Sequence, residues 1–278
     1  MTEAEFTALR AFLKRSSGLD LGPEKRYLVE SRLGPVCRAS GLPGLSGVVQ
    51  RLLAGSDPDL AGAVVDAMTT NETMFFRDRA FFEALRQDLL PALMARRPSR
   101  RLRIWSAAAS TGQEAYSVAM LLDEMRPRRE GWTVEILGSD VSQRAIERAR
   151  DGIFTQFEVQ RGLPIRLLMR HFRETSRGWR ISAAMREAVQ FRPFNLLGDP
   201  EAFGTFDLVL CRNVLIYMDV ATKGCILDRL ARIVAPDGAL CLGSTESVVG
   251  LSRVFTPHPG QRNVAVPALP PARIGAAA

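Results

Sequence analysis

Residues 102–117, "LRIWSAAASTGQEAYS", contain an apolar run, a turn of small residues and the start of a helix. The first part, 102–108, is rich in apolar residues and is predicted to be a buried strand. "ASTG" (109–112) supplies the turn, and the helix is expected from about Glu114 to Met125. A strand that leads through a short turn into a helix is the unit from which α/β domains are built.

The same alternation continues along the chain. Further strands are predicted at 132–140, 206–213 and 238–244, and helices at 142–150 and 221–234. Apolar strands separated by helices indicate a parallel sheet covered on both faces, and hence a doubly wound α/β domain. One segment breaks the rhythm, because "FRETSRGWRIS" (172–182) is typical of a hairpin that turns near Ser176–Gly178. We therefore expect a small antiparallel insertion at about 165–192.

The N-terminal part has a different pattern. Residues 1–68 are predicted to form short helices, in which apolar residues such as Phe6, Leu9 and Leu13 share one face. From Arg10 to Arg51 there are eight basic and three acidic residues, so we expect a small all-α module with a basic surface. The α/β domain would occupy 69–265, and the Pro/Ala-rich tail, 266–278, is expected to be disordered.

Composition limits the class of protein. The chain has 278 residues, of which 46% are hydrophobic and 24% charged, as is ordinary for a soluble globular protein. Four cysteines without a CxxC pair favour a reducing compartment. Neither a signal peptide nor an apolar run of roughly 20 residues is apparent, so a cytoplasmic location is expected. The net charge of +7 fits an arginine-rich solvated surface or an acidic partner, and composition does not choose between them.

Ligands of open α/β sheets bind at the carboxyl ends of the strands. Small residues at 107–110 and Gly112 would let a ligand approach the backbone, although such a turn can also merely pack a helix on a strand. Asp140 ends the second strand, where a carboxylate can bind a ribose diol or cap the next helix. Ribose recognition fits both a dinucleotide and S-adenosylmethionine.

Polar residues also follow the later strands. Arg212 and Asn213 end a buried strand, Asn195 follows another, and Tyr217 is either at the rim of the same pocket or a packed aromatic residue. The chain has only two histidines, so neither a Ser/His/Asp triad nor a histidine metal site is expected. It has no GxxxxGK[ST] motif, so no phosphate-binding loop of that type is expected.

One further stretch, "TTNETMFFRD" (69–78), fits neither a helix nor a strand period. Together with "IWSAAASTGQEAYS" (104–117) and "FDLVLCRNVLIY" (206–217), in this order and at these separations, it resembles the CheR-type chemotaxis receptor glutamate methyltransferases. The resemblance extends to about residue 265. It implies an all-α N-terminal domain, an α/β S-adenosylmethionine domain and an inserted antiparallel subdomain.

The resemblance also implies a site. Arg77 and Tyr217 correspond to the residues nearest the transferred methyl group. The expected contacts to the cofactor are Asn71, Thr73, Arg77, Glu114, Asp140, Asn195, Leu196, Arg212 and Asn213. Two departures are visible: "GQEAYS" (112–117) stands where the family often has GEEPYS, and Ser142 replaces a frequent second acidic residue.

The implied reaction is methyl transfer from S-adenosylmethionine to glutamate side chains on the cytoplasmic helices of chemoreceptors, with S-adenosylhomocysteine as the second product. A glutamate is already anionic at pH 7, so no general base is required. The basic N-terminal helices would dock on the acidic receptor bundle. The hairpin resembles the element with which some family members bind a receptor's C-terminal pentapeptide. A monomer without nucleic acid or membrane insertion is expected.

Three alternatives compete with this function. A nucleic-acid methyltransferase would suit the positive charge, but "RNVL" (212–215) stands where many such enzymes have an Asn/Asp-Pro-Pro-aromatic motif, and aromatic residues are sparse. A non-catalytic regulator that binds S-adenosylmethionine is disfavoured because Arg77, Asp140, Asn213 and Tyr217 are all present. An NAD-dependent dehydrogenase lacks its Gly-rich fingerprint.

Overall fold

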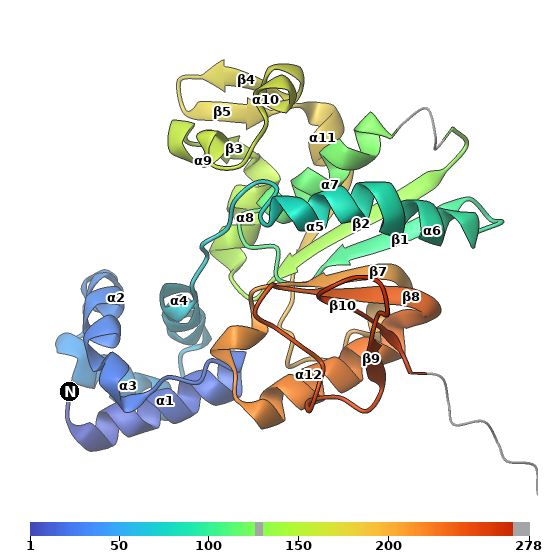
Figure 1. Ribbon diagram of the computed structural model, residues 1–278. Coiled ribbons are helices and arrows are strands. Elements are labelled where there is room, and N and C mark those ends of the chain that lie inside the picture. Colours follow the sequence, from blue (N-terminus) through green and yellow to red (C-terminus); the bar gives the residue numbers. More distant parts are fainter. Residues whose placement is uncertain (126–129, 269–278) are drawn as a thin grey trace, which may run out of the picture.

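The computed structural model describes residues 1–125 and 130–268. Its main feature is a seven-stranded sheet in the order β6-β2-β1-β7-β8-β10-β9, which confirms the predicted doubly wound architecture (Figure 1). The five strands from β6 to β8 are parallel, whereas β10 is antiparallel to both β8 and β9. The strands are β1 (Arg101–Ser106), β2 (Thr133–Asp140), β6 (Val189–Pro193), β7 (Phe206–Cys211), β8 (Val234–Leu242), β9 (Phe255–Pro257) and β10 (Val264–Pro267).

Helices cover both faces of this sheet. One face carries α7 and the long helix formed by α5, a π-helical turn (η2) and α6, while α12 packs on the other. In β7, Leu208 and Leu210 belong to the first core and Val209 and Cys211 to the second, so alternate residues of the strand are buried on opposite faces of the sheet. The helices are α5 (Arg79–Ala84), η2 (Leu85–Leu89), α6 (Leu90–Ala95), α7 (Gln113–Glu124), α8 (Gln143–Asp151), α11 (Ala183–Glu187) and α12 (Val220–Ile233).

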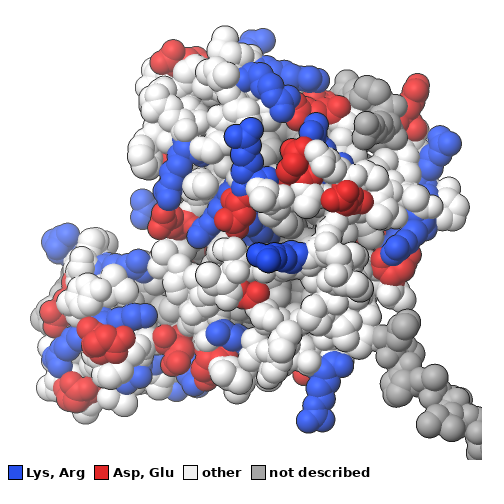
Figure 2. All heavy atoms as spheres, viewed as in Figure 1, with Lys and Arg blue, Asp and Glu red and all other residues white. Residues whose placement is uncertain are grey.

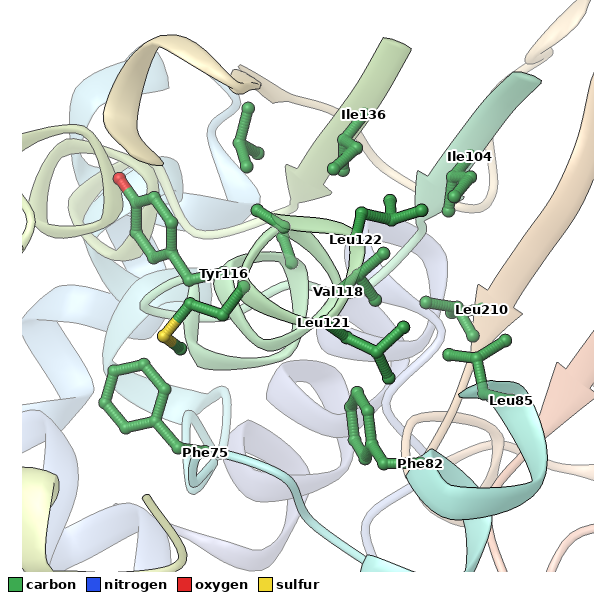
Figure 3. Packing of buried hydrophobic residues seen from close by; sticks show 14 of the residues in the cluster. Phe75, Phe82, Leu85, Ile104, Tyr116, Val118, Leu121, Leu122, Ile136 and Leu210 are labelled. Atoms are coloured by element: carbon green, nitrogen blue, oxygen red, sulfur yellow. The ribbon is translucent and has the colours of Figure 1, made fainter. Parts of the chain in front are cut away.

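Helix α7 lies at the centre of the first core. Its Val118 and Leu122 side chains lie toward the sheet residues Ile104 and Ile136, and Leu121 lies toward Phe82 of α5 (Figure 3). These residues are almost fully buried, which explains why the segment 114–125 is apolar around most of its circumference.

The predicted hairpin is present, but the insertion around it has other limits. A three-stranded antiparallel sheet, β3-β5-β4, stands above the main sheet with two short helices (Figure 1). The expected range 165–192 is wrong at both ends. The insertion begins earlier, because β3, which consists of residues 153 and 154, pairs with β5. It also ends earlier, because β6 pairs with β2 of the main sheet. The elements are β3 (Ile153–Phe154), α9 (Gln156–Gln160), α10 (Ile165–His171), β4 (Phe172–Thr175) and β5 (Gly178–Ile181).

The N-terminal helices form a third core of their own, with Phe6, Leu9 and Leu13 at its centre. A capping box between Thr2 and Glu5 begins the first helix. The elements are α1 (Glu3–Ser17), η1 (Pro23–Lys25), α2 (Arg26–Ala39), α3 (Gly44–Leu53) and α4 (Pro58–Met68). We call residues 1–68 the helical module.

The surface of the helical module is less basic than expected. Over residues 1–68 there are eight basic and eight acidic residues, and Figure 2 shows both kinds interleaved on the face in view. Four of the basic side chains, Arg10, Lys14, Arg26 and Arg32, bind acceptors within the chain. The exposed basic residues that remain are Arg15, Lys25, Arg38 and Arg51.

Two further findings concern the C-terminal end of the described residues and the length of the helices. Val266 and Pro267 pair with β9, so the expectation of a disordered tail from residue 266 is wrong for these two residues, and 269–278 lie outside the described residues. Within the described ranges, we find no helix whose length and apolarity would suit a membrane crossing.

Loop 69–78 connects the helical module to α5 and is held by two phenylalanines. Phe75 is fully buried and meets Phe154 of β3 and Phe172 of β4 edge-on, with ring centroids 5.0 and 5.6 Å apart. Phe76 packs on Phe82 of α5, and its backbone N–H donates to Oγ of Ser117 at 2.9 Å. The stretch has no helix or strand period because its neighbouring residues are anchored to different parts of the fold.

Gly162 offers a test of this anchoring. It has a positive φ of 88°, and a Cβ atom added there would lie 2.1 Å from the carbonyl oxygen of Phe75. We expect Gly162→Ala to lower the free energy of unfolding by about 1–3 kcal/mol more than a control, because the loop must move. The control is Gly55→Ala, at a φ of 66° with nothing within 4 Å of the added atom. Equal losses for the two variants in urea denaturation would contradict the packing argument.

Candidate functional site

One pocket, at the carboxyl ends of the parallel strands, receives all of the residues predicted to form the site. It encloses about 930 Å³ of empty space, with the solvent at its mouth included. The strand ends share one edge of the sheet, which is why segments distant in the sequence meet there. The predicted residues in its lining are Asn71, Thr73, Arg77, Glu114, Asp140, Asn195, Leu196, Arg212, Asn213 and Tyr217.

The turn after β1 lines the pocket and also packs the start of α7 on its neighbours. Ala107, Ala108 and Ser110 line the pocket. Gly112, with a φ of 96°, lies at the start of α7 where an added Cβ would lie 3.0–3.1 Å from Ala149 and two aromatic rings. The turn therefore packs α7 closely on its neighbours and leaves open backbone toward the pocket.

Asp140 is the acidic group at the end of β2. Its side chain accepts hydrogen bonds from the backbone N–H groups of Ser110 at 2.8 Å and Ser142 at 2.9 Å, and the residue is only 8% exposed. Burial raises the pKa of this carboxyl above its usual value, against the effect of the hydrogen bonds. Ser142, rather than Asp140, caps α8 by accepting from Ala145. A carboxylate has about four acceptor positions, so this side chain can still accept from a ligand.

Arg212 ties three parts of the pocket together. Its guanidinium donates to Glu114 of α7 at 2.9 Å, and to the Asp78 carboxylate and the Arg77 carbonyl of loop 69–78 at 2.5 and 3.1 Å. It lies 4.1 Å from the ring centre of Phe81, and the side chain is 1% exposed. Its Nε atom is buried and has no acceptor among the described residues. Arg212 therefore acts mainly as a link within the protein.

Glu114 is fixed from two sides. One carboxylate oxygen accepts from the Arg212 guanidinium and the other from Oγ of Ser106, at the end of β1, at 2.8 Å. Both contacts are charge-assisted hydrogen bonds, and so the orientation of this carboxylate is well defined before a ligand binds.

Arg77 and Tyr217 keep polar groups available to a ligand. The Arg77 guanidinium donates to the carbonyl oxygen of Glu72 at 3.2 Å and to no other described residue. The Tyr217 hydroxyl has no hydrogen bond within the described part of the chain, while its backbone carbonyl accepts from Asp20 of the helical module at 2.9 Å. Both residues are half-buried in the pocket wall.

Asn195 has a role that the sequence did not indicate. Its side-chain N–H donates to the carbonyl oxygen of Ser16 at 2.6 Å, and its side-chain oxygen accepts from Leu197 at 3.0 Å. The residue thus joins the end of α1 to the α/β domain while also lining the pocket. Leu196 beside it is buried in the second core.

The sequence did not predict several residues of the site. Asp78, the partner of Arg212, lies in the quoted loop and was identifiable by its position next to Arg77. The end of α1 also reaches the pocket, although its sequence gives only a turn signal. The additional lining residues are Ser17, Leu19, Thr69, Thr70, Glu72, Val141, Phe194, Val214 and Met218.

Comparison with known proteins gives one consistent result. Residues 71–264 match the family model described as CheR methyltransferase, SAM binding domain, and residues 4–69 match CheR methyltransferase, all-alpha domain. The chain is 40% identical over 251 residues to chemotaxis protein methyltransferase Cher2 of Pseudomonas putida, which covers 89% of this chain and 91% of the relative. It is 34% identical over 261 residues to the chemotaxis protein methyltransferase of Escherichia coli, covering 92% and 88%.

The Arg212 link can be tested by stability. We expect Arg212→Met to lower the free energy of unfolding by about 3 kcal/mol, because it leaves the Glu114 and Asp78 carboxylates without their partner. The control is Arg232→Met, whose ion pair with Glu201 is more than half exposed and should contribute less than about 1 kcal/mol. Similar losses in guanidinium denaturation would show that Arg212 is not a central link.

Proposed function

Because this chain belongs to the CheR methyltransferase family, we propose that it transfers the methyl group of S-adenosylmethionine to glutamate side chains on the cytoplasmic helices of chemoreceptors. Family membership makes it an S-adenosylmethionine-dependent methyltransferase of chemotaxis. The glutamate acceptor and the roles of individual residues are inferred from the chemistry of the pocket.

The pocket residues fit this cofactor. Besides the hydrogen bonds from Ser110 and Ser142, the Asp140 carboxylate can accept from a ligand, which suits the hydroxyls of a ribose. The buried Nε of Arg212 lacks an acceptor, and the carboxylate of the cofactor's methionine moiety would supply one. Ala107 and Ala108 leave room for a bound group beside the backbone. When bound, S-adenosylmethionine supplies a methyl group activated by its sulfonium charge.

The glutamate assignment rests on the hydrogen-bond partners of the carboxylates in the pocket. Glu114 is held by Arg212 and Ser106, and Glu72 pairs with Arg161. The remaining acceptor positions of Asp140 are assigned to the ribose, so we assign no general base to the pocket. A glutamate acceptor, with an ordinary pKa near 4.3, arrives deprotonated and needs no base. The residues of this chain then have to orient the acceptor and exclude water.

Arg77 is the residue best placed to orient such an acceptor. Apart from the contact with Glu72, its guanidinium N–H groups have no acceptor among the described residues and can donate charge-assisted hydrogen bonds to a carboxylate at the pocket wall. Too strong a contact would lower the nucleophilicity of the carboxylate, so we assign Arg77 to positioning. The free Tyr217 hydroxyl can donate to the same group or orient the transferred methyl.

The receptor partner is inferred from charge. The exposed basic residues of the helical module, with Lys25 and Arg38 on or beside α2, face solvent and can attract an acidic helix. Since the module is neutral in total, we expect orientation of the receptor from these few side chains rather than a strong long-range attraction.

The acceptor class can be tested with labelled cofactor. Incubated with tritiated S-adenosylmethionine and receptor-containing membranes, the protein should produce label that base releases as methanol, because carboxyl methyl esters hydrolyse and N-methyl groups do not. Arg77→Ala should lower the rate about 100-fold through misplacement of the acceptor. Arg79→Ala, an exposed arginine two residues away, is the matched control. Base-stable label, or label in nucleic acid, would refute the assignment.

The docking surface can be tested by charge reversal. Lys25→Glu combined with Arg38→Glu should raise the KM for receptor about tenfold, more at low salt, while the Kd for S-adenosylmethionine stays unchanged. Arg26 is unsuitable because it binds Glu3 and Glu30 within the module. Reversal of Arg144, an exposed arginine on α8, serves as the control. Equal effects of the two reversals would place the receptor elsewhere.

A further inference from the structure

Glu246 is a buried carboxylate outside the pocket. It lies on the turn after β8, is 7% exposed, and accepts hydrogen bonds from four backbone N–H groups. One oxygen accepts from Asn213 and Gly243, both at 2.7 Å, and the other from Val214 at 3.0 Å and Ile216 at 3.3 Å. Among the described residues, no lysine, arginine or histidine forms an ion pair with it.

Three of the four donors belong to one short segment, residues 213–216, which follows β7 and leads into the 3₁₀ turn η5 (Leu215–Tyr217). Asn213 has a φ of 59°, a left-handed conformation that asparagine adopts more readily than most other residues with a side chain. Val214, the residue that precedes η5, has an apolar side chain and cannot cap the turn. The Glu246 carboxylate therefore supplies the acceptors that stabilise this conformation from 30 residues away.

The segment held by Glu246 carries the inner wall of the pocket. Asn213, Val214 and Tyr217 line the pocket, whereas Glu246 does not. We propose that Glu246 is a positioning residue for methyl transfer: it fixes the backbone of 213–217 and thereby places the Asn213 side chain and the Tyr217 hydroxyl. The part of this role that concerns the acceptor rests on the function proposed above.

The turn around the carboxylate is built for a charged acceptor. A Cβ atom on Gly243 would lie 2.6 Å from the Asn213 side-chain nitrogen and equally close to a Glu246 oxygen, so no larger residue fits without displacing them. Glutamine has the same shape as glutamate, but its amide NH₂ would face backbone donors where a second oxygen now accepts. Burial of an anion without a cation partner is unfavourable unless hydrogen bonds of this kind compensate it.

Methyl transfer and cofactor binding test this role together. For Glu246→Gln we expect a kcat about 100-fold lower and a Kd for S-adenosylmethionine about 10-fold higher, because small displacements in the pocket have large effects on rate. Glu246→Asp, which retains the charge, should recover part of both. The control is Glu201→Gln, a more than half-exposed carboxylate paired with Arg232, which should behave as wild type.

A double-mutant cycle with Tyr217→Phe separates positioning from mere support of the fold. If Glu246 acts through Tyr217, Glu246→Gln should lower kcat much less in the Tyr217→Phe background, so that the two effects are not additive. Additive effects, or a lower melting temperature with kcat and Kd equal to those of Glu201→Gln, would overturn the proposal.

Two provisions keep the test decisive. If Glu246→Gln does not fold, Gly243→Ala displaces Asn213 while the carboxylate is retained; it should show the same loss of kcat, and wild-type activity would overturn the proposal. The Kd for S-adenosylmethionine, measured by calorimetry, does not depend on a methyl acceptor. If the wild-type protein fails to methylate receptors, the proposed function fails, and the Kd of the Glu246 variants still decides whether this residue positions Asn213.

Discussion

The buried guanidinium of Arg212 is the contact on which the pocket depends. It joins the end of β7 to α7 through Glu114 and to loop 69–78 through Asp78 and the Arg77 carbonyl. Without this cation, the carboxylates of Glu114 and Asp78 would lie without a positive partner in a partly buried part of the pocket wall, where their negative charges would repel each other. The loop also contains two residues of positive φ, Phe76 and Asp78. Arg212 holds the side chain of Asp78, and Ser117 accepts from the backbone N–H of Phe76.

The overall fold and the position of the site could be predicted because each depends on patterns in the sequence. The centre of strand β7 is apolar because its alternate residues face different cores, and parallel strands bring their carboxyl ends to one edge. The limits of the insertion could not be predicted, since β3 has two residues and no period. Glu246 could not be found either, because a single glutamate in a turn carries no sign of partners 30 residues away.

Residue type also did not indicate which partner each site residue has. Asn195 was expected to contact cofactor, yet its amide joins α1 to the α/β domain, and Arg212 is occupied mostly by protein acceptors. By contrast, Arg77 and Tyr217 keep free polar groups in the pocket. Some of the site residues therefore keep groups available to a ligand and others hold the pocket wall in place, and residue type alone does not distinguish the two roles.

The contacts of Phe75 have a consequence for how this architecture can be altered. Phe154 and Phe172, which enclose Phe75, both belong to the inserted sheet, and Arg161 of the same insertion pairs with Glu72 of the loop. The insertion is therefore not a detachable module. A chimera that exchanges it between relatives has to carry matching aromatic residues on both sides of the junction, and a deletion would expose a phenylalanine two residues from Arg77.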